Sequence, residues 1–485
     1  MAPDTADFNP GQSSDTGSNL LLSKRDTFFE QALSLHQQGD VEQALTLYQQ
    51  VVDLDPDHAQ ACFYSALLLC DSGNHEDALS LLEKAQALLP DIPAIVYQLG
   101  VCQYTLGENN LAIRSFETVL ETEQDHWQAA YNLGAAYFSD GQILKAIEAY
   151  SLAARLNPDD ADIYFNLGLA HKNAGDLEKA RSAYIHSMEI IPDDADVHYN
   201  LGRLHNDMGQ KEDAITSLEI ATVLRPDFGA ALTNLGVLYV DQNATDKAIA
   251  VYEKLIEIDH HPISSRHILN ALTGKTTDSA PLSYVRELYD DFAGHFDKRL
   301  VEDLLYDIPR QFVDFLNEQR ATQYPFQRML DLGCGTGLCG QAFSGMVNSI
   351  TGVDLSEKMI EKARSKDVYD ALIQDDIISF VEGVNEPYDL IVAGDVLIYL
   401  GELESIFNRL ANCLSENGRV LFSTECFDGK GYRLCQSGRY AHSTSYVTKL
   451  AQENGLQVLA VKSVNSRKEH GAWIAGDIYL LGHVL

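Results

Sequence analysis

In the first half of the chain, small and apolar residues return with a spacing of 34 residues. Most units end near a proline, at Pro56, Pro90, Pro158, Pro192 and Pro226, and Gln124 stands at the equivalent position between Pro90 and Pro158. A small residue follows ten positions later and an alanine 22 positions later. This pattern predicts two short helices per unit, which approach closely at the small residues and are joined through a glycine with positive φ. Proline ends each unit because it cannot continue a helix.

Seven such units fit the chain. Their bounds are 25–58, 59–92, 93–126, 127–160, 161–194, 195–228 and 229–262. We expect a disordered polar tail at residues 1–24, and a capping helix and linker at 263–281. A second domain is predicted at 282–485.

In this second domain, short apolar runs alternate with helical stretches. The runs lie at 328–332, 349–354, 369–374, 388–394, 418–424, 456–464 and 473–485. Helical patterns fall between them at 356–366, 402–414 and 443–453. Strands that alternate with helices predict a parallel sheet with both faces covered, and the direct link between the last two runs predicts an antiparallel hairpin at one edge. The expected fold is an all-α solenoid followed by a seven-stranded α/β domain.

Charge narrows the choice of partners. The formal net charge of the 485 residues is −36. Residues 1–262 hold 14 Lys and Arg against 41 Asp and Glu. Such a field repels phosphate backbones, so we expect no nucleic-acid partner and favour a neutral or basic one.

Cysteine usage and hydropathy bear on location. The eight cysteines include no CxxC pair, and the histidines at 260, 261 and 267 lack ligand spacing. We therefore expect free thiols in a reducing compartment and no metal site. We also expect no signal peptide, and the sequence has no run of about 18 apolar residues. The predicted location is the cytoplasm, with no membrane partner.

Four asparagines recur at one position of the repeats, in YNLG, FNLG, YNLG and TNLG. They are Asn132, Asn166, Asn200 and Asn234. A carboxamide has both a donor and an acceptor, so a column of them can pair with the peptide groups of an extended chain. An equally open alternative is that they are ordinary residues of the repeat with no ligand.

The 34-residue spacing resembles that of the tetratricopeptide repeat. The resemblance implies a solenoid whose first helices line a peptide-binding groove. Members that grip a terminal carboxylate use Lys and Arg near the asparagines, whereas this chain has Gln128, Asp162 and Asp196. We therefore predict a protein partner bound in the groove through an internal segment.

The chemistry of the second domain centres on DLGCGTGLCG at 331–340. Glycines at 333, 335 and 337 follow a predicted strand, and such a loop lets a ligand contact the backbone. Asp354 ends the next strand, where a carboxylate can accept hydrogen bonds from ribose hydroxyls. A dinucleotide site is one interpretation. However, Asp331 lies just before the first glycine, and an acid suits a cationic ligand better than a pyrophosphate.

This loop resembles the first motif of class I S-adenosylmethionine-dependent methyltransferases. GVDLSEKMIEKA, QDDI and YDLIVAGDVLIYL follow in the family's order. More narrowly, YDDFAGHFDKRL and GRYAHS resemble segments of bacterial methyltransferases fused to tetratricopeptide repeats. The resemblance implies S-adenosylmethionine as cofactor, held by Asp331, Gly333, Gly335, Gly337, Asp354, Leu355, Asp375, Asp376, Ile377 and Ala393. It also implies that Gly394 and Asp395 line the floor of the site.

Catalytic groups are less well defined by sequence. Asp395, Tyr399 and His442 are the candidate bases, with core packing as the competing explanation for His442. Arg433 and Arg439 are candidates for binding a substrate carboxylate or phosphate. Tyr289, Phe292 and Phe296 form a candidate lid or, equally, part of the core.

Three functions fit these observations. The first is a methyltransferase whose repeats recruit a protein substrate or regulator. The second is a methyltransferase for a small molecule, with repeats used for assembly. The third is a non-enzymatic scaffold that binds the cofactor without turnover.

Overall fold

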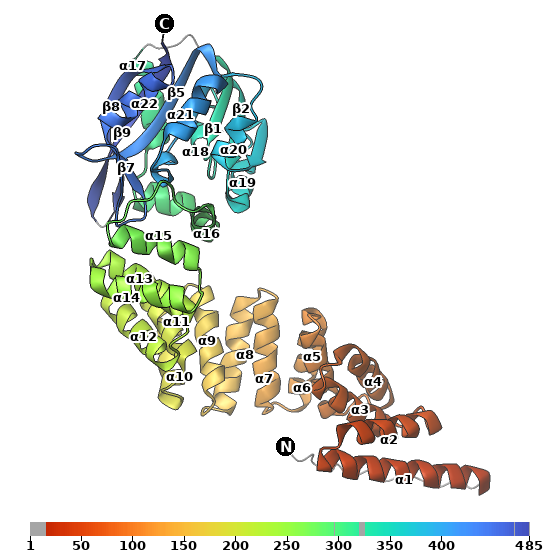
Figure 1. Cartoon of the computed structure of the whole chain (residues 1–485). Helices are drawn as coiled ribbons and strands as arrows, with labels where there is room; N and C mark the ends of the chain where they lie inside the picture. Colours follow the sequence, from red (N-terminus) through yellow and green to blue (C-terminus); the bar gives the residue numbers. More distant parts are fainter. Residues whose placement is uncertain (1–15, 295, 320–324, 470, 485) are drawn as a thin grey trace. The chain divides into compact units, whose positions relative to one another are not determined.

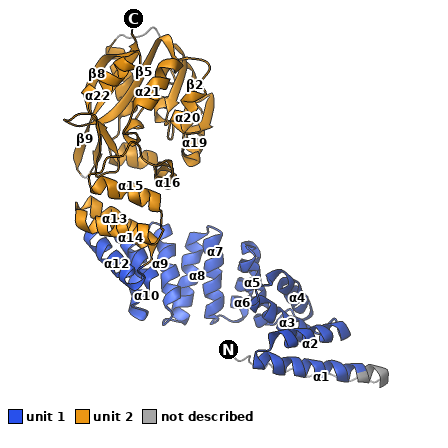
Figure 2. Ribbon diagram, in the orientation of Figure 1, with its two compact units in different colours: residues 1–226 blue, residues 227–485 orange. Residues whose placement is uncertain are grey.

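A computed structural model describes residues 16–294, 296–319, 325–469 and 471–484 (Figure 1). The chain divides into two compact units, Met1–Pro226 and Asp227–Leu485 (Figure 2). Each unit is described separately.

Unit 1 consists of helical pairs, as predicted. The helices are α1 (Thr16–Gln38), α2 (Val41–Leu54), α3 (Ala59–Asp71), α4 (His75–Leu88), α5 (Pro93–Thr105), α6 (Asn109–Thr122), α7 (Trp127–Ser139), α8 (Ile143–Leu156), α9 (Ala161–Asn173), α10 (Leu177–Ile190), α11 (Ala195–Asp207) and α12 (Lys211–Leu224). The turn glycines have positive φ, for example 81° at Gly73. A Cβ at Gly134 would lie 2.6 Å from the ring of Tyr150, so the small residue allows the two helices of this repeat to touch.

The N-terminal helix differs from expectation. Residues 1–24 were predicted as a disordered tail, whereas α1 begins at Thr16. Arg25 in this helix pairs with Asp55 at 2.7 Å, which fixes α1 against the end of the first repeat. Residues 1–15 of the predicted tail lie outside the described residues.

Unit 2 begins with the last predicted repeat rather than after it. Its first helices are α13 (Gly229–Asp241), α14 (Thr245–Glu257) and α15 (Pro262–Leu272). The predicted linker is bonded to the second domain, because Ala280 N donates to Tyr399 O at 2.9 Å and Tyr432 donates to Asp278 at 2.7 Å. His267 of α15 also lies 2.8 Å from the carbonyl of Gly438. The seventh repeat and the linker therefore belong to one compact body with the α/β domain.

The α/β domain is built on a mixed sheet. The strands are β1 (Phe326–Leu332), β2 (Val347–Asp354), β3 (Ala371–Gln374), β4 (Tyr388–Ala393), β5 (Leu414–Cys426), β6 (Tyr432–Leu434), β7 (Tyr440–His442), β8 (Leu456–Glu469) and β9 (Ala472–His483). Strands β3, β2, β1, β4 and β5 are parallel neighbours in that order. β9 pairs antiparallel with both β5 and β8, which confirms the edge hairpin.

Two short strands were missed by the sequence pattern. β6 and β7 pair with each other, and β7 joins the end of β5. Three residues are too few to show an alternation of apolar and polar positions. These strands matter for the site, because Arg439 immediately precedes β7.

Helices cover both faces of the sheet (Figure 1). The helices of this part are α16 (Leu282–Phe292), the π-helix η1 (Lys298–Asp303), α17 (Ile308–Glu318), α18 (Leu338–Phe343), α19 (Glu357–Arg364), α20 (Ile377–Glu382), η2 (Leu397–Tyr399), α21 (Glu404–Cys413) and α22 (Thr444–Glu453). One core packs Phe407 and Val447 against Phe422, and the other packs Phe312 and Phe343 against Met329. The parallel strands are thus buried on both sides, which leaves their carboxyl ends as the place for a site.

Candidate active site

The glycine loop after β1 needs its glycines for two different reasons. All three have positive φ, with 63° at Gly333, 53° at Gly335 and 91° at Gly337. A Cβ at Gly333 would also lie 2.1 Å from Val396 Cγ2, which leaves no room for it. At Gly335, the nearest heavy atom to such a Cβ is Phe296 Cε1 at 4.0 Å. Gly333 is therefore required for packing, whereas the missing side chain of Gly335 leaves open space.

Asp354 at the end of β2 holds this loop in place. Its Oδ2 accepts from the backbone N–H of Gly335 at 2.8 Å, and its Oδ1 accepts from Ser356 N at 2.9 Å. Burial raises the pKa of Asp354, and the backbone donors oppose that shift. The carboxylate retains lone pairs that can accept from further hydroxyl groups.

Asp331 lies behind the loop. Its side chain is 1% exposed, and its Oδ2 accepts from the Tyr369 hydroxyl at 2.6 Å. Burial raises the pKa of Asp331 to about 7. Its Oδ1 is buried and has no hydrogen-bond partner among the described residues. A buried acceptor without a donor is costly, so this oxygen is suited to a cationic or N–H-bearing ligand.

A cavity of about 490 Å³ lies in front of the loop. Of the predicted cofactor residues, those that line it are Gly333, Gly335, Asp354, Leu355, Asp376 and Ile377. Asp331, Gly337, Asp375 and Ala393 lie outside this lining. Asp375 instead accepts from Asp376 N, and Asp376 caps α20 by accepting from Ser379 N at 3.0 Å.

The aromatic residues proposed as a lid do line the cavity. Tyr289 and Phe292 belong to α16, and Phe296 follows it. The Tyr289 hydroxyl donates to the Tyr399 hydroxyl at 3.1 Å. Burial raises the pKa of Tyr289 to about 12 and the pKa of Tyr399 well above its usual range. Both tyrosines thus keep their protons at neutral pH, so Tyr399 is not a base there.

A buried cluster of charges borders the cavity through all its members except Glu425, and we call it the charge cluster. It contains Asp395, Glu425, Arg439, Arg467 and Glu469. Arg467 is 5% exposed and donates to Asp395, Glu425 and Glu469. Arg439 lies 2.7 Å from Glu425 and from Glu469. Three carboxylates therefore face two guanidinium groups, and each guanidinium is already paired.

Asp395 is held firmly in this cluster. It follows β4 and has a φ of 56°, unusual for a residue with a side chain. Its Oδ1 accepts from the Ser423 hydroxyl at 3.0 Å, and Ser423 in turn accepts from Asp395 N at 2.9 Å. Asp395 also pairs with Arg467, so its side chain is anchored from two directions.

Two sequence expectations are corrected here. His442 does not line the cavity, because it is buried in β7 beside the carbonyl of Gly401 at 3.1 Å. Burial lowers the pKa of His442 to about 4, so it is neutral. Arg433 is exposed and stacks over the ring of Phe427 at 5.0 Å. Neither residue reaches the site.

Comparison with known families agrees with this geometry. Residues 330–420 match the model of a methyltransferase domain. Models of tetratricopeptide repeats match 29–93, 69–137, 134–175, 161–194 and 199–260. The chain carries a methyltransferase domain behind tetratricopeptide repeats.

Individual relatives resemble parts of the chain. A malonyl-acyl-carrier-protein O-methyltransferase of Bacillus anthracis is 28% identical over 139 residues, which is 28% of this chain and 48% of the relative. A ubiquinone biosynthesis O-methyltransferase of Thiobacillus denitrificans is 28% identical over 131 residues, or 26% of this chain and 53% of the relative. The chain thus spans about half the length of these curated relatives. The crystal structure of YrrB, titled as a TPR protein with an unusual peptide-binding site, is 25% identical with a TM-score of 0.35, covering 38% of this chain and 96% of YrrB.

Several residues of the methyltransferase site were missed by sequence reasoning. Glu425, Arg467 and Glu469 complete the charge cluster, but no local motif marks them. Val237 and Asp241 of α13 also line the cavity. Because both residues lie in a helix of the seventh repeat, the sequence linked them only to the predicted peptide-binding groove. Glu425 is buried in β5 directly after Ser423 and Thr424, and this polar end of the strand gave no distinct signal in the sequence.

The asparagines of the repeats in unit 1 bond within the chain. Asn132 donates to the Tyr97 hydroxyl at 2.9 Å, and Asn166 donates to the Tyr131 hydroxyl at 2.9 Å. Each tyrosine lies 35 residues earlier, in the preceding repeat. At the same distance before Asn200 stands Phe165, which has no hydroxyl, and Asn200 donates to the carbonyl of Asp196 at 2.8 Å. The bonds to Tyr97 and Tyr131 tie adjacent repeats, whereas the bond of Asn200 lies within its own helix, and peptide binding by the asparagines stays a prediction.

Hydropathy of the helices agrees with the sequence. Within the described part of the chain, none of the helices is long and apolar enough to cross a membrane.

Proposed function

We propose that the chain transfers a methyl group from S-adenosylmethionine to a neutral acceptor with an apolar body. One observation carries this proposal: a single cavity joins the glycine loop, Asp354 and Asp376 to the aromatic residues of α16 and to the charge cluster. The glycine loop, Asp354 and Asp376 are the features expected for binding the cofactor. The last two provide room and polarity for a second molecule.

The residues present fit the cofactor. The open space at Gly335 admits a ligand against the backbone, and the free Oδ1 of Asp331 offers a buried acceptor behind the loop. Asp354 can accept from ribose hydroxyls, while Ile377 and Leu355 provide apolar surface for an adenine. When bound, the cofactor supplies an activated methyl group on a sulfonium. The protein needs mainly to align the acceptor and exclude water.

The charge cluster restricts the acceptor. Its three carboxylates outnumber its two guanidinium groups, and both guanidinium groups are already paired. A carboxylate or phosphate substrate would therefore meet no free cation there. A neutral hydroxyl is the better fit, because Asp395 lines the cavity and its carboxyl oxygens can accept a hydrogen bond from such a group.

We further propose that the repeats recruit a protein, which is either the substrate or a regulator. The acidic surface of the first 262 residues supports a neutral or basic partner. Asp196, at one of the lysine-free positions, is paired with Arg225 at 2.6 Å. This pairing supports an internal segment over a terminal carboxylate as the ligand. A cytoplasmic location is part of this proposal, since all eight cysteines are free thiols.

A second candidate is a small-molecule methyltransferase whose repeats serve assembly. Two observations favour it: the largely apolar residues at the lid side of the cavity, and relatives named as O-methyltransferases. Tritiated S-adenosylmethionine incubated with the full chain and a lysate separates the candidates. Label in the protein fraction supports recruitment, and label in the small-molecule fraction supports the second candidate. Cofactor binding without label in either fraction supports the third function, a scaffold that binds the cofactor without turnover.

The control for this experiment is a chain in which the cofactor cannot bind. Gly333→Val places a side chain on Val396, but it also disturbs folding. Asp354→Ala leaves the backbone donors of Gly335 and Ser356 without their acceptor and is the milder choice. Absence of measurable cofactor binding by the unmodified chain at millimolar concentration would end both methyltransferase candidates.

A further inference from the structure

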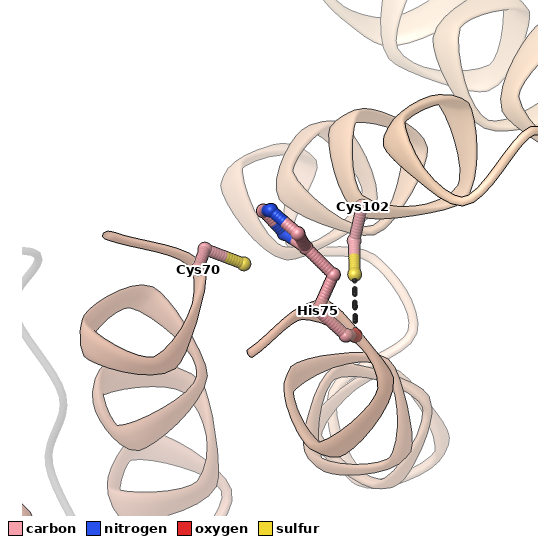
Figure 3. Close-up of side chains that lie close together, drawn as sticks. All are labelled: Cys70, His75 and Cys102. Carbon is pink, nitrogen blue, oxygen red and sulfur yellow. Dashed lines mark hydrogen bonds between the residues drawn. The ribbon is translucent and has the colours of Figure 1, made fainter. Parts of the chain in front are cut away.

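Two cysteines and a histidine meet inside unit 1, far from the methyltransferase site in sequence. Cys70 lies near the end of α3, His75 is the first residue of α4, and Cys102 belongs to α5 of the next repeat. The ligand-type atoms of all three lie within 4.8 Å of one another. Figure 3 shows the two sulfur atoms on either side of His75. We call this group the Cys–His cluster.

The surroundings hold these side chains in place. The turn between α3 and α4 is closed by Gly73 N bonding to Cys70 O at 3.0 Å. The Cys102 thiol donates to the carbonyl of His75 at 3.0 Å. Cys102 is fully buried, within an apolar cluster that also contains Leu82 and Leu99. The three residues are therefore positioned by the repeat framework and not by flexible loops.

The histidine has an unsatisfied nitrogen. His75 Nδ1 is buried and has no hydrogen-bond partner among the described residues. A neutral imidazole presents a lone pair on one ring nitrogen, which is the form that binds metals. A buried ring nitrogen without a donor or acceptor nearby is costly unless a ligand satisfies it.

The cluster is peculiar to one junction of the solenoid. Positions equivalent to Cys102 in the other repeats hold Ser34, Leu68, Ala136, Ala170, Leu204 and Leu238. Positions equivalent to His75 hold Val41, Asn109, Ile143, Leu177, Lys211 and Thr245. The repeat pattern therefore does not require these ligands. Only the contact between the second and third repeats brings them together.

We propose that Cys70, His75 and Cys102 bind a zinc ion that links the second and third repeats. Two thiolates and an imidazole are soft and intermediate ligands that suit zinc, whereas magnesium and calcium prefer oxygen. Zn–S bonds of about 2.3 Å and Zn–N bonds of about 2.0 Å require the ligand atoms to approach by roughly 1 Å. Three protein ligands leave a fourth position for water. This proposal departs from the expectation of no metal drawn from the spacing of cysteines and histidines.

Ionisation of the thiols accompanies binding. In the structure the Cys102 thiol carries its proton, which it donates to the carbonyl of His75. A metal ion replaces that proton and balances the thiolate charge. Glu108 adds negative charge near Cys102, which favours a cation over a neutral occupant.

The test uses the full chain, reduced with a phosphine and stripped of metal. One equivalent of Zn²⁺ is added, excess is removed by gel filtration, and zinc is measured by mass spectrometry. We expect about one zinc per chain for the unmodified protein, and a strong loss for Cys70→Ser and Cys102→Ser. His75→Ala, at the partly exposed start of α4, should lose zinc as well. Cys62→Ala, a buried cysteine of the same helix as Cys70, is the matched control and should retain the metal.

Cobalt provides an independent readout. Co²⁺ bound to the cluster should show thiolate charge-transfer absorption, absent in Cys70→Ser and Cys102→Ser. Zinc should also raise the thermal midpoint of unit 1, followed through Trp127, in the unmodified chain and in Cys62→Ala. Equal zinc content in the unmodified chain and in the cluster variants would overturn the proposal. So would a Cys70–Cys102 disulfide in the chain as purified without reductant, shown by intact mass after alkylation.

Discussion

A methyl group added at position 335 tests whether the glycine loop is a ligand site. In Gly335→Ala, the new Cβ meets open space, with Phe296 Cε1 as the nearest heavy atom at 4.0 Å. The packing of the fold is therefore unchanged, and the backbone N–H that Asp354 accepts remains. The methyl group instead occupies the side of the cavity where the cofactor is expected to bind. Binding should weaken by more than tenfold, which is about 1.4 kcal/mol.

The positive φ of 53° at Gly335 adds a separate cost. An alanine there is strained by about 1 kcal/mol, in stability rather than in binding. Gly431→Ala is the matched control: it lies in the same unit, has a φ of 73°, and a Cβ there has nothing within 4 Å. Both variants should lose a similar free energy of unfolding. Only Gly335→Ala should lose cofactor affinity.

Two assays separate these effects. Calorimetric titration with S-adenosylmethionine measures affinity, and urea unfolding followed through Trp473 measures the stability of unit 2 in a Trp127→Phe background. The chain has two tryptophans, one in each unit, so the signal is unambiguous. Affinity of Gly335→Ala within twofold of the unmodified chain would refute the reasoning. An equal loss of affinity in Gly431→Ala would refute it as well.

Four further predictions follow from the contacts. Arg467→Met leaves three carboxylates facing one guanidinium group and should destabilise unit 2 by about 3–5 kcal/mol, measured by urea unfolding. A loss below about 1 kcal/mol would contradict the pairing described for the charge cluster. Tyr97→Phe and Asn132→Ala should each cost unit 1 about 1 kcal/mol, with no further loss in the double variant because they share one bond. In the folded protein the pKa of Asp331 is about 7, above its unfolded value. The unmodified chain should therefore lose up to about 4 kcal/mol of stability as pH rises from 4 to 7, whereas Asp331→Asn should not show this loss. Parallel curves of stability against pH for the two proteins would contradict the assignment. A chain that begins at Asp227 should bind the cofactor as the full chain does. A chain that begins at residue 282 should not bind it, because that chain lacks α13 and the linker that is bonded to the second domain. Equal cofactor binding by both shortened chains would contradict the unit boundary.

The repeats and the positions of the main strands were predictable because both are periodic or local. A helix pair of 34 residues leaves its small residues and prolines at regular positions, and seven apolar runs marked the strands that build the main sheet. The glycine loop was equally readable, since positive φ and close backbone contact restrict the residue type. Gly333, Gly335 and Asp354 were assigned to the site from these local signals, whereas Leu355, Asp376 and Ile377 were assigned from the resemblance to class I methyltransferases; all six line the cavity.

Only the tertiary structure decided which distant side chains meet. Arg439 looked free for a substrate, but folding brings Glu425 and Glu469 against it. His442 looked like a base, yet it is buried away from the cavity and neutral. Ion pairs and burial depend on residues many positions apart, which leave no regular spacing in the sequence.

The same distinction between local pattern and tertiary contact holds within the repeats. Asn132 recurs visibly at a fixed position, but its bond to Tyr97 appears only when neighbouring repeats stack. Cys70, His75 and Cys102 have no ligand spacing, and three helices bring them together. By itself, the sequence determined the elements and the glycine loop, because backbone conformation is set by near neighbours. Charge pairing and metal-type clusters were decided by packing, because they form between surfaces that meet only in the folded protein.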